Sequence, residues 1–224
     1  KGMNESQVIV SVHNYDRMDN AFNTGTYMIY GNGDQAFLPL GCIDVTGHEI
    51  IHGLTQHVSG LVYQGESGAL NESFSDVFGV AFEHWMYRKY NNNERDDDDI
   101  DGKFDWLMGE DIGDRMRYLR NIQDPTDAEY PQPKFYKGEH WFDTSDTSAQ
   151  NDYGGVHVNS GVPNYCFYLF SRQVGLYAAT RVFYNVLKNM KPNSQFADFA
   201  RELVRQTPEH NKAKAEAALK SVGL

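Results

Sequence analysis

The segment His-Glu-Ile-Ile-His at residues 48–52 places two imidazoles and a carboxylate within an otherwise apolar stretch. On a helix, side chains four residues apart lie on one face, so His48 and His52 can present two nitrogen atoms to one point. Neutral imidazoles are common Zn²⁺ ligands, and Glu49, about 100° further round the helix, would lie beside such an ion as a base. A surface helix with two unrelated histidines is the alternative interpretation.

A second polar pair, Glu72 and Asp76, lies four residues apart in Asn-Glu-Ser-Phe-Ser-Asp at 71–76. If the two segments form antiparallel helices, the numbers of facing residues have a constant sum, and one register pairs His52 with Glu72 and His48 with Asp76. This register predicts a zinc site of His48, His52 and Glu72 with its fourth position open to water. Asp76 would then accept a hydrogen bond from the other ring nitrogen of His48 and fix its tautomer.

The same register brings Asp44 near Glu83, one level away from the expected zinc site. Two carboxylates in contact repel each other unless a cation lies between them. Asp105 and Glu110 belong to an acidic run over 94–111, and they could complete the all-oxygen ligand set that Ca²⁺ prefers. We therefore predict one calcium site formed by these four carboxylates. A solvated loop is the alternative interpretation of the acidic run.

The pattern of apolar residues predicts an α+β fold with little strand at the start and mainly helix afterwards. Gly60 suits the C-terminal cap of the first long helix, and Ser67 could cap the second. The expected strands are 7–12 and 26–30, and the expected helices are 44–58, 67–90, a short one near 113–122, 160–190, 194–206 and 209–221.

Composition narrows the classes of partner. The chain has 224 residues and a formal net charge of −11, which argues against nucleic acid and against an anionic membrane surface as partners. No apolar stretch is long enough to span a membrane. Cys42 and Cys166 could form one bridge, but their apolar surroundings favour two free, buried thiols.

Taken together, these motifs resemble the thermolysin-like zinc metallopeptidases, the family of thermolysin, bacillolysin and pseudolysin. The resemblance runs from about residue 11 to residue 224, and implies a remnant of an N-terminal β-rich domain plus the central helix over 1–59, followed by a mainly α-helical domain over 60–224. It also implies that a further β-rich portion precedes residue 1 in the family's mature enzymes. The matching segments are HEIIH with Glu72 twenty residues on, DNAF (19–22), GLVYQGESGALNESFSD (60–76), DWLMGEDI (105–112), RYLRNIQDP (117–125) and DYGGVHVNSG (152–161).

The resemblance implies a role for each matching residue. Glu49 would be the general base, His157 and Tyr63 would hydrogen-bond the tetrahedral intermediate, and Asp152 would orient His157. The peptide backbone would be bound by Asn20 and Ala21, and a substrate carbonyl by Arg120. The apolar pocket after the scissile bond would be lined by Phe37, Leu40, Val45, Met108, Ile112 and Leu119.

The implied function is a secreted, monomeric endopeptidase made with an inhibitory propeptide, acting on peptides or proteins. It would cut on the amino side of large hydrophobic residues, by attack of a zinc-bound water that Glu49 deprotonates. A non-catalytic extracellular zinc- and calcium-binding module derived from such a protease is the alternative. A zinc aminopeptidase would need acidic residues that grip a free amino terminus, and no motif for them is present.

Three departures from the family pattern bear on this interpretation. Asn23 stands where members often have tryptophan soon after the Asn-Ala pair, so the substrate contacts there are expected to differ. Leu107 and Lys103 replace a glutamate and an asparagine of the family's double calcium site, which favours one calcium ion over two. The stretch between Arg120 and His157 is longer than usual and could form a flap at the cleft.

Overall fold

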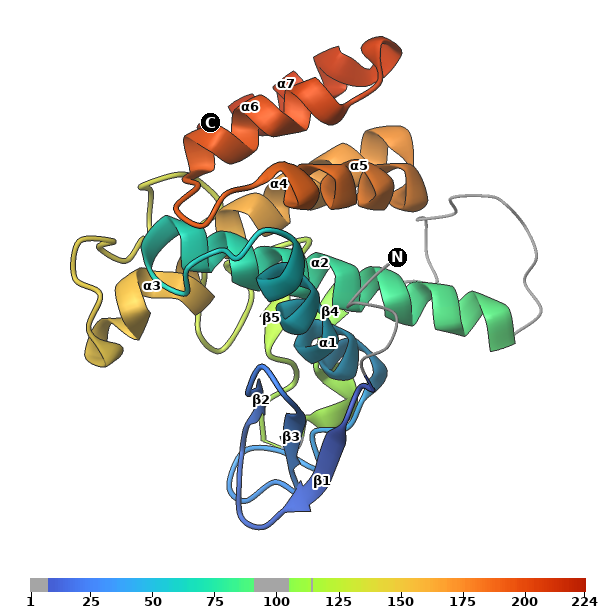
Figure 1. Cartoon of the computed structure of the whole chain (residues 1–224), viewed down its shortest axis with the longest axis vertical. Coiled ribbons are helices and arrows are strands. Elements are labelled where there is room, and N and C mark those ends of the chain that lie inside the picture. The colour runs from blue at the N-terminus through green and yellow to red at the C-terminus, as the bar shows by residue number, and fades with distance from the viewer. Residues whose placement is uncertain (1–7, 91–104, 114) are drawn as a thin grey trace.

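The computed structural model describes residues 8–90, 105–113 and 115–224. Two long helices, α1 (Ile43–Val58) and α2 (Gly65–Tyr90), cross the middle of the molecule. A small sheet lies on one side of them and the C-terminal helices lie on the other (Figure 1). The expected α+β class, with a short β portion followed by a mainly helical region, is confirmed.

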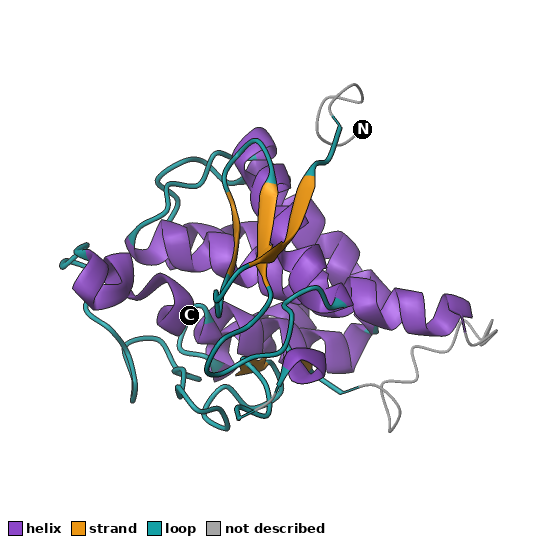
Figure 2. Ribbon diagram, turned by 90° about the horizontal axis from the view of Figure 1, so that it is seen from below, coloured by secondary structure: helices purple, strands orange, loops and turns teal. Residues whose placement is uncertain are grey.

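The N-terminal sheet has the strand order β1-β3-β2. β1 (Ser11–Tyr15) runs parallel to β3 (Met28–Gly31), and β2 (Ala21–Asn23) runs antiparallel to it. β1 starts later than the predicted strand because its pairing with β3 begins at Ser11. β2 has only three residues and too little alternation for the sequence to reveal it, yet it forms an edge of this sheet, whose strands are orange in Figure 2, and it contacts α1.

A glycine contact sets the close approach of α1 and α2. A Cβ atom added at Gly79 would lie 2.6 Å from the carbonyl oxygen of Asp44, and one at Gly47 would lie 3.1 Å from the Cα of Gly79. Larger residues at either position would push the helices apart. The two glycines therefore let polar side chains on neighbouring turns meet across the seam between the helices.

The ends of these helices agree only in part with the sequence analysis. Gly60 has φ +63° and its N–H donates to the carbonyl of Thr55, as expected of a C-terminal cap. The prediction that Ser67 caps α2 is wrong, because the helix begins at Gly65. The Ser67 hydroxyl instead donates to the carbonyl oxygens of Val62 and Gln64, which anchors the first turn.

The short helix predicted near 113–122 is also wrong. A 3-10 turn, Glu110–Ile112, precedes this segment, and β5 (Arg120–Asn121) occupies its end. β5 pairs antiparallel with β4 (Leu107–Met108), so the backbone hydrogen bonds of Arg120 go to a neighbouring strand rather than along a helix.

The C-terminal region contains five α-helices among the described residues, and the predicted helix 160–190 is divided in two at Gly175, whose φ is +91°. Helix α3 begins with four left-handed residues, 152–155. The elements after β5 are η2 (Ala149–Asn151), α3 (Asp152–Asn159), α4 (Gly161–Val174), α5 (Leu176–Asn189), α6 (Phe196–Gln206), η3 (Glu209–Asn211) and α7 (Lys212–Ser221).

Aromatic rings fill the core where α2 meets the C-terminal helices. The ring of Phe183 lies 4.8 Å from Phe167 and 5.6 Å from Phe199, both edge to face. Cys166 is buried in the same core and, like Cys42, is a free thiol, so the prediction of two unpaired cysteines is confirmed. This rigid half of the molecule supports the face of α2 that turns toward the site.

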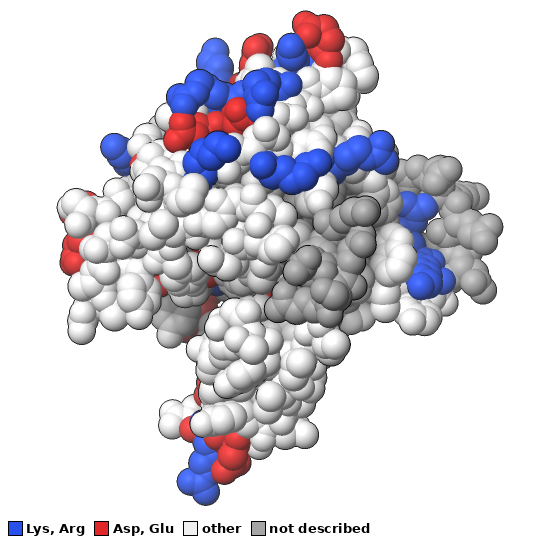
Figure 3. All heavy atoms as spheres, viewed as in Figure 1, with Lys and Arg blue, Asp and Glu red and all other residues white. Residues whose placement is uncertain are grey.

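Charge is unevenly spread over the surface. Figure 3 shows Lys and Arg side chains gathered over the C-terminal helices, while little charge is visible around the middle of that face. Among the described residues, none of the helices has the length and apolar character needed to cross a bilayer.

Candidate active site

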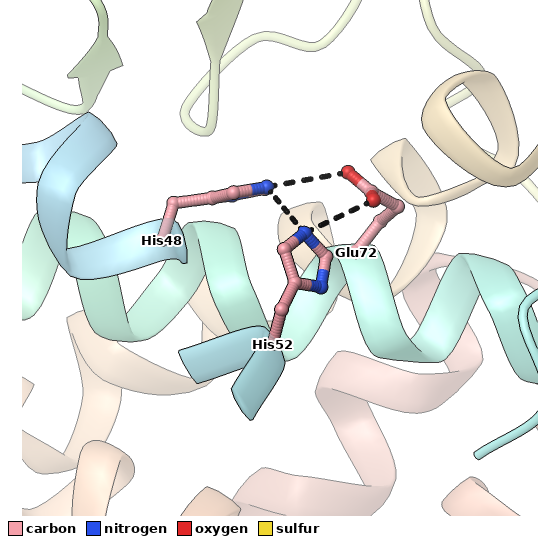
Figure 4. A group of neighbouring side chains, drawn as sticks. All are labelled: His48, His52 and Glu72. Carbon is pink, nitrogen blue, oxygen red and sulfur yellow. Dashed lines mark hydrogen bonds and ion pairs between the residues drawn. The ribbon is translucent and has the colours of Figure 1, made fainter. Parts of the chain in front are cut away.

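Three donor groups converge between α1 and α2 (Figure 4). The Nε2 atoms of His48 and His52 lie 2.9 Å apart. The carboxylate of Glu72 lies 3.5 Å from the first and 3.3 Å from the second. Ligands of a tetrahedral zinc ion at 2.0–2.1 Å are separated by about 3.3 Å, so this spacing fits one ion. We call His48, His52 and Glu72 the histidine cluster.

The Nδ1 atom of each imidazole, which points away from the cluster, lies close to a side-chain oxygen atom. His48 Nδ1 lies 2.9 Å from Asp76 Oδ1, as the register predicted. His52 Nδ1 lies 2.9 Å from Asn71 Oδ1. Protons on both Nδ1 atoms leave both Nε2 lone pairs facing each other, an arrangement that repels unless a cation lies between them. The donor set therefore fits a zinc ion.

Asn71 was not found from the sequence. Asn71 directly precedes Glu72, the residue that the antiparallel register pairs with His52. This position next to Glu72 is the signal that the sequence offered. An amide oxygen is a weaker acceptor than the carboxylate that holds His48, so the two imidazoles have unequal partners.

The guanidinium of Arg120 contacts both buried carboxylates of the site, Glu72 and Asp76. Glu72 and Asp76 have no exposed surface, and Arg120 Nη1 lies 2.8 Å from Asp76 Oδ1. Burial opposes ionisation of Glu72, but the imidazoles of His157, His52 and His48 and the guanidinium of Arg120 hold its pKa below the usual range. Burial lowers the pKa of His52 to about 4, which keeps the imidazole neutral, as a metal ligand must be.

Glu49 lies beside the histidine cluster and is 4% exposed. Its Oε2 atom has no hydrogen-bond partner among the described residues. Burial raises the pKa of Glu49 to about 7, with the nearby charge of Glu72 acting in the same direction. A carboxylate with a free oxygen and a pKa near neutrality is suited to accept and return a proton.

The opposite wall of the site is formed by Tyr63 and His157. The Tyr63 hydroxyl donates to Glu72 and lies 3.0 Å from His157 Nε2. Asp152 accepts from His157 twice, at 2.6 Å from Nδ1 and at 2.7 Å from the backbone N–H. Desolvation opposes protonation of His157, but Glu72 and Asp152 raise its pKa above the usual value.

An unusual backbone supports this wall. Asp152 and Tyr153 both adopt left-handed conformations, with φ of 52° and 53°, and Gly154 and Gly155 continue the turn. A Cβ atom at Gly155 would lie 2.5 Å from Phe142, so only glycine fits there. The turn folds the Asp152 carboxylate back onto His157, and it could not do so in a regular helix.

The site opens into a cleft of 1180 Å³. Eight of the nine expected substrate-binding residues line it: Asn20, Ala21, Arg120, Phe37, Leu40, Val45, Met108 and Leu119. Ile112 is the exception, because it lines a separate cavity of 430 Å³ beside Cys42. Its place in the substrate pocket stays a prediction.

A second group of ligand atoms lies one helical turn away. Carboxylate oxygens of Asp44, Glu83 and Glu110, here called the acidic cluster, lie within 4.8 Å of one another. Burial and the neighbouring carboxylates raise the pKa of Glu83 to about 9 and that of Glu110 to about 7. Like charges this close favour a cation among them.

Asp105, the fourth predicted calcium ligand, is not among the oxygens that lie within 4.8 Å of one another, but its charge helps to raise the pKa of Glu83 and of Glu110, so its place in the ligand set stays a prediction. Its carboxylate is exposed and accepts a hydrogen bond from the backbone N–H of Leu107 at 3.1 Å, as a turn residue does. Residues 94–104 of the predicted calcium-binding run lie outside the described residues.

Two antiparallel helices that carry a His-Glu-x-x-His segment and a facing glutamate, beside an open cleft, define the class of helix-based zinc metallopeptidases. Two family models match the chain: the catalytic domain of thermolysin metallopeptidases over residues 1–56, and their alpha-helical domain over residues 59–223. The chain belongs to the thermolysin metallopeptidase family.

Several relatives are similar along almost the whole chain. Neutral protease NprE of Bacillus pumilus is 38% identical over 98% of this chain and 67% of its own length. Bacillolysin of Bacillus subtilis is 38% identical over 98% of this chain, which spans only 39% of that relative. The solved precursor of protealysin from Serratia proteamaculans superposes with a TM-score of 0.76 at 32% identity, covering 91% of this chain and 65% of that one.

Proposed function

We propose that this protein is a zinc-dependent endopeptidase that hydrolyses internal peptide bonds on the amino side of large hydrophobic residues. The observation that carries the proposal is the convergence of the histidine cluster beside Glu49, a buried carboxylate with one oxygen unpartnered among the described residues. When bound, zinc supplies a Lewis acid that polarises the scissile carbonyl and lowers the pKa of water.

The residues around the cluster divide the work of binding and proton transfer. His48, His52 and Glu72 hold the ion, while Asp76 keeps the His48 imidazole in the tautomer that presents Nε2. Glu49 takes the proton from the attacking water and then delivers it to the leaving nitrogen. A pKa of about 7 makes both transfers accessible near neutral pH.

The opposite wall stabilises the charge that develops on the scissile carbonyl. Tyr63 and His157 present a hydroxyl and a ring N–H to the same side of the site, 3.0 Å from each other. Asp152 holds the His157 ring from behind and favours its protonated form. Donors aligned before the reaction contribute most where charge appears only in the transition state.

Substrate recognition would combine an edge strand with an apolar pocket. The free edge of β2 offers the backbone groups of Ala21 to an extended peptide, and Asn20, whose own carbonyl accepts from Gly31, would bind the same peptide from its place in the cleft lining. Arg120 lines the cleft and would hold a substrate carbonyl. The pocket formed by Leu40, Val45 and neighbouring side chains has apolar walls, which favours Leu or Phe after the scissile bond.

Calcium and cellular context belong to the same proposal. One calcium ion in the acidic cluster would neutralise Asp44, Glu83 and Glu110 and tie the segment after β4 to the helix pair. The relatives carry the names neutral protease and bacillolysin, and the protealysin structure is that of a precursor. These names support a protease that acts on peptides or proteins and is made as a precursor; that the propeptide is inhibitory and that the protease is secreted and monomeric belong to the proposal alone.

The test measures the cleavage of two fluorogenic substrates by the zinc-loaded protein. One substrate is internally quenched, and the other has a free amino terminus and is blocked only at its carboxyl side. Glu49→Gln keeps the size of the side chain but removes the base, so we expect full zinc content with the rate lowered by about 10³-fold or more. Cleavage of only the substrate with the free amino terminus would indicate an aminopeptidase. Zinc binding with no cleavage of either substrate would favour the non-catalytic module.

A further inference from the structure

Asn23, the last residue of β2, connects the sheet to the catalytic helix. Its Nδ2 donates to the main-chain carbonyl of Glu49 at 2.7 Å. Its Oδ1 accepts from the backbone N–H of Gly25, also at 2.7 Å. Because one partner is a backbone acceptor and the other a backbone donor, the orientation of the amide is determined without ambiguity.

The bond to Glu49 is not needed to complete the helix. Glu49 lies in the middle of α1, where its carbonyl can accept the usual bond from the N–H four residues later. The Asn23 amide is therefore a second donor to that oxygen, supplied from outside the helix. It joins β2, which begins at Ala21, to the turn that carries His48 and Glu49.

A simpler reading is that Asn23 only shapes the turn after β2. The bond from Gly25 to Oδ1 spans two residues and is the contact that Asn and Asp commonly make in such turns. That role needs only the side-chain oxygen, whereas the bond to Glu49 needs the NH₂ group.

We propose that Asn23 is a positioning residue that clamps the substrate-binding strand β2 onto the catalytic turn of α1. This inference rests on the proposed peptidase function. The clamp fixes the distance between a peptide paired with β2 and the catalytic groups, Glu49 and the histidine cluster. In Figure 1, β2 lies directly beside α1, and the two elements are in contact.

The clamp affects long and short substrates differently. A peptide that pairs with β2 over several residues is placed by the strand, so a displaced strand misplaces the scissile carbonyl. A short blocked dipeptide is placed by the apolar pocket and the metal site alone. Misplacement by about 1 Å can cost 10²-fold in rate, and it acts on kcat as well as on KM.

Asn23→Asp is the matched test, because the carboxylate keeps the acceptor for Gly25 and lacks the donor for Glu49. We expect kcat/KM for a long quenched peptide to fall by about 10-fold or more, mainly through kcat, with less than about twofold change for the short substrate. Asn23→Ser is the uncharged companion: its hydroxyl can serve the turn but is too short to reach Glu49, so the same loss is expected.

Zinc content and thermal midpoint are measured for both variants, so that a folding defect is recognised. A parallel loss on long and short substrates, or an unchanged ratio between them in a folded variant, would overturn the clamp while leaving the peptidase proposal intact. If Asn23→Asp does not fold, the Asn23→Ser ratio decides in the same way. An unmodified, zinc-loaded protein that cleaves neither substrate refutes the proposed function itself.

Discussion

The seam between α1 and α2 contains two clusters of ionisable side chains, one helical turn apart, whose charges are balanced differently. In the histidine cluster, the carboxylate of Glu72 is surrounded by the imidazoles of His157, His52 and His48 and by the guanidinium of Arg120, which hold its pKa low. In the acidic cluster, the strongest electrostatic neighbours of Glu83 are other carboxylates, and with its burial they raise its pKa to about 9.

The difference indicates how one pair of helices can present two kinds of candidate metal site. Asp44, His48 and His52 follow four residues apart on α1, while the facing residues Glu72, Asp76 and Glu83 follow four and seven residues apart on α2, so successive turns of the seam bring together different side chains. Two imidazole nitrogens and a carboxylate whose charge is offset by its neighbours suit zinc, and three such ligands leave the fourth position open for water or substrate. Carboxylates alone suit a hard cation, whose role is to join elements rather than to react.

The largest expected effect comes from breaking the histidine cluster. Glu72→Ala removes one donor and leaves Arg120 without one of its two carboxylate partners. We expect loss of zinc and a fall in peptide hydrolysis of about 10³-fold or more, because the Lewis acid contributes several kcal/mol to the transition state. Metal analysis and rate measurement check this together.

The matched control for that variant is Glu83→Ala in the acidic cluster, which is expected to keep zinc at one ion per chain. If Glu83→Ala loses zinc as Glu72→Ala does, the two clusters are not independent sites and the comparison between them is wrong.

Calcium removal at constant zinc is expected to have the next largest effect. A ligand at 100 times its Kd stabilises the folded state by about 2.7 kcal/mol, which corresponds to about 5–10 °C in thermal midpoint for a domain of this size. Calorimetry with and without added Ca²⁺, at fixed zinc occupancy, measures the shift. Glu83→Gln should abolish it, because the acidic cluster then loses a charged ligand. If the thermal midpoint of the unmodified protein is the same with and without Ca²⁺, the calcium assignment is contradicted.

A smaller effect is expected from the carboxylate behind His48. Asp76→Asn keeps the shape of the side chain but weakens the hydrogen bond to Nδ1, so zinc affinity should fall by about 10–100-fold. Competition with a chromophoric chelator measures the change. Asp152→Asn is the control, since Asp152 orients His157, which is not a proposed zinc ligand, and zinc affinity should stay unchanged. Equal affinities in all three proteins would mean that Asp76 does not tune the site.

Helical spacing in the sequence predicted three of the contacts between α1 and α2, but it missed the contact of Asn71 with His52. A helix repeats its side-chain directions every 3.6 residues, so spacing alone predicts that His48 and His52 share a face and that Glu72 and Asp76 can oppose them. Both contacts are present, as is the meeting of Asp44 with Glu83. The positions of Tyr63, His157 and Asp152 came from the family resemblance, not from periodicity.

The contributions of the segments outside these two helices became visible only in the folded structure. Loops have no repeating geometry, so nothing in the sequence distinguished Glu110, which joins the acidic cluster, from Asp105, which serves a turn. The same holds for Ile112, which lines a separate cavity, and for Asn23, whose partner on α1 is 26 residues away along the chain. Such contacts depend on where the backbone of one element comes to lie against another, and local spacing carries no information about that.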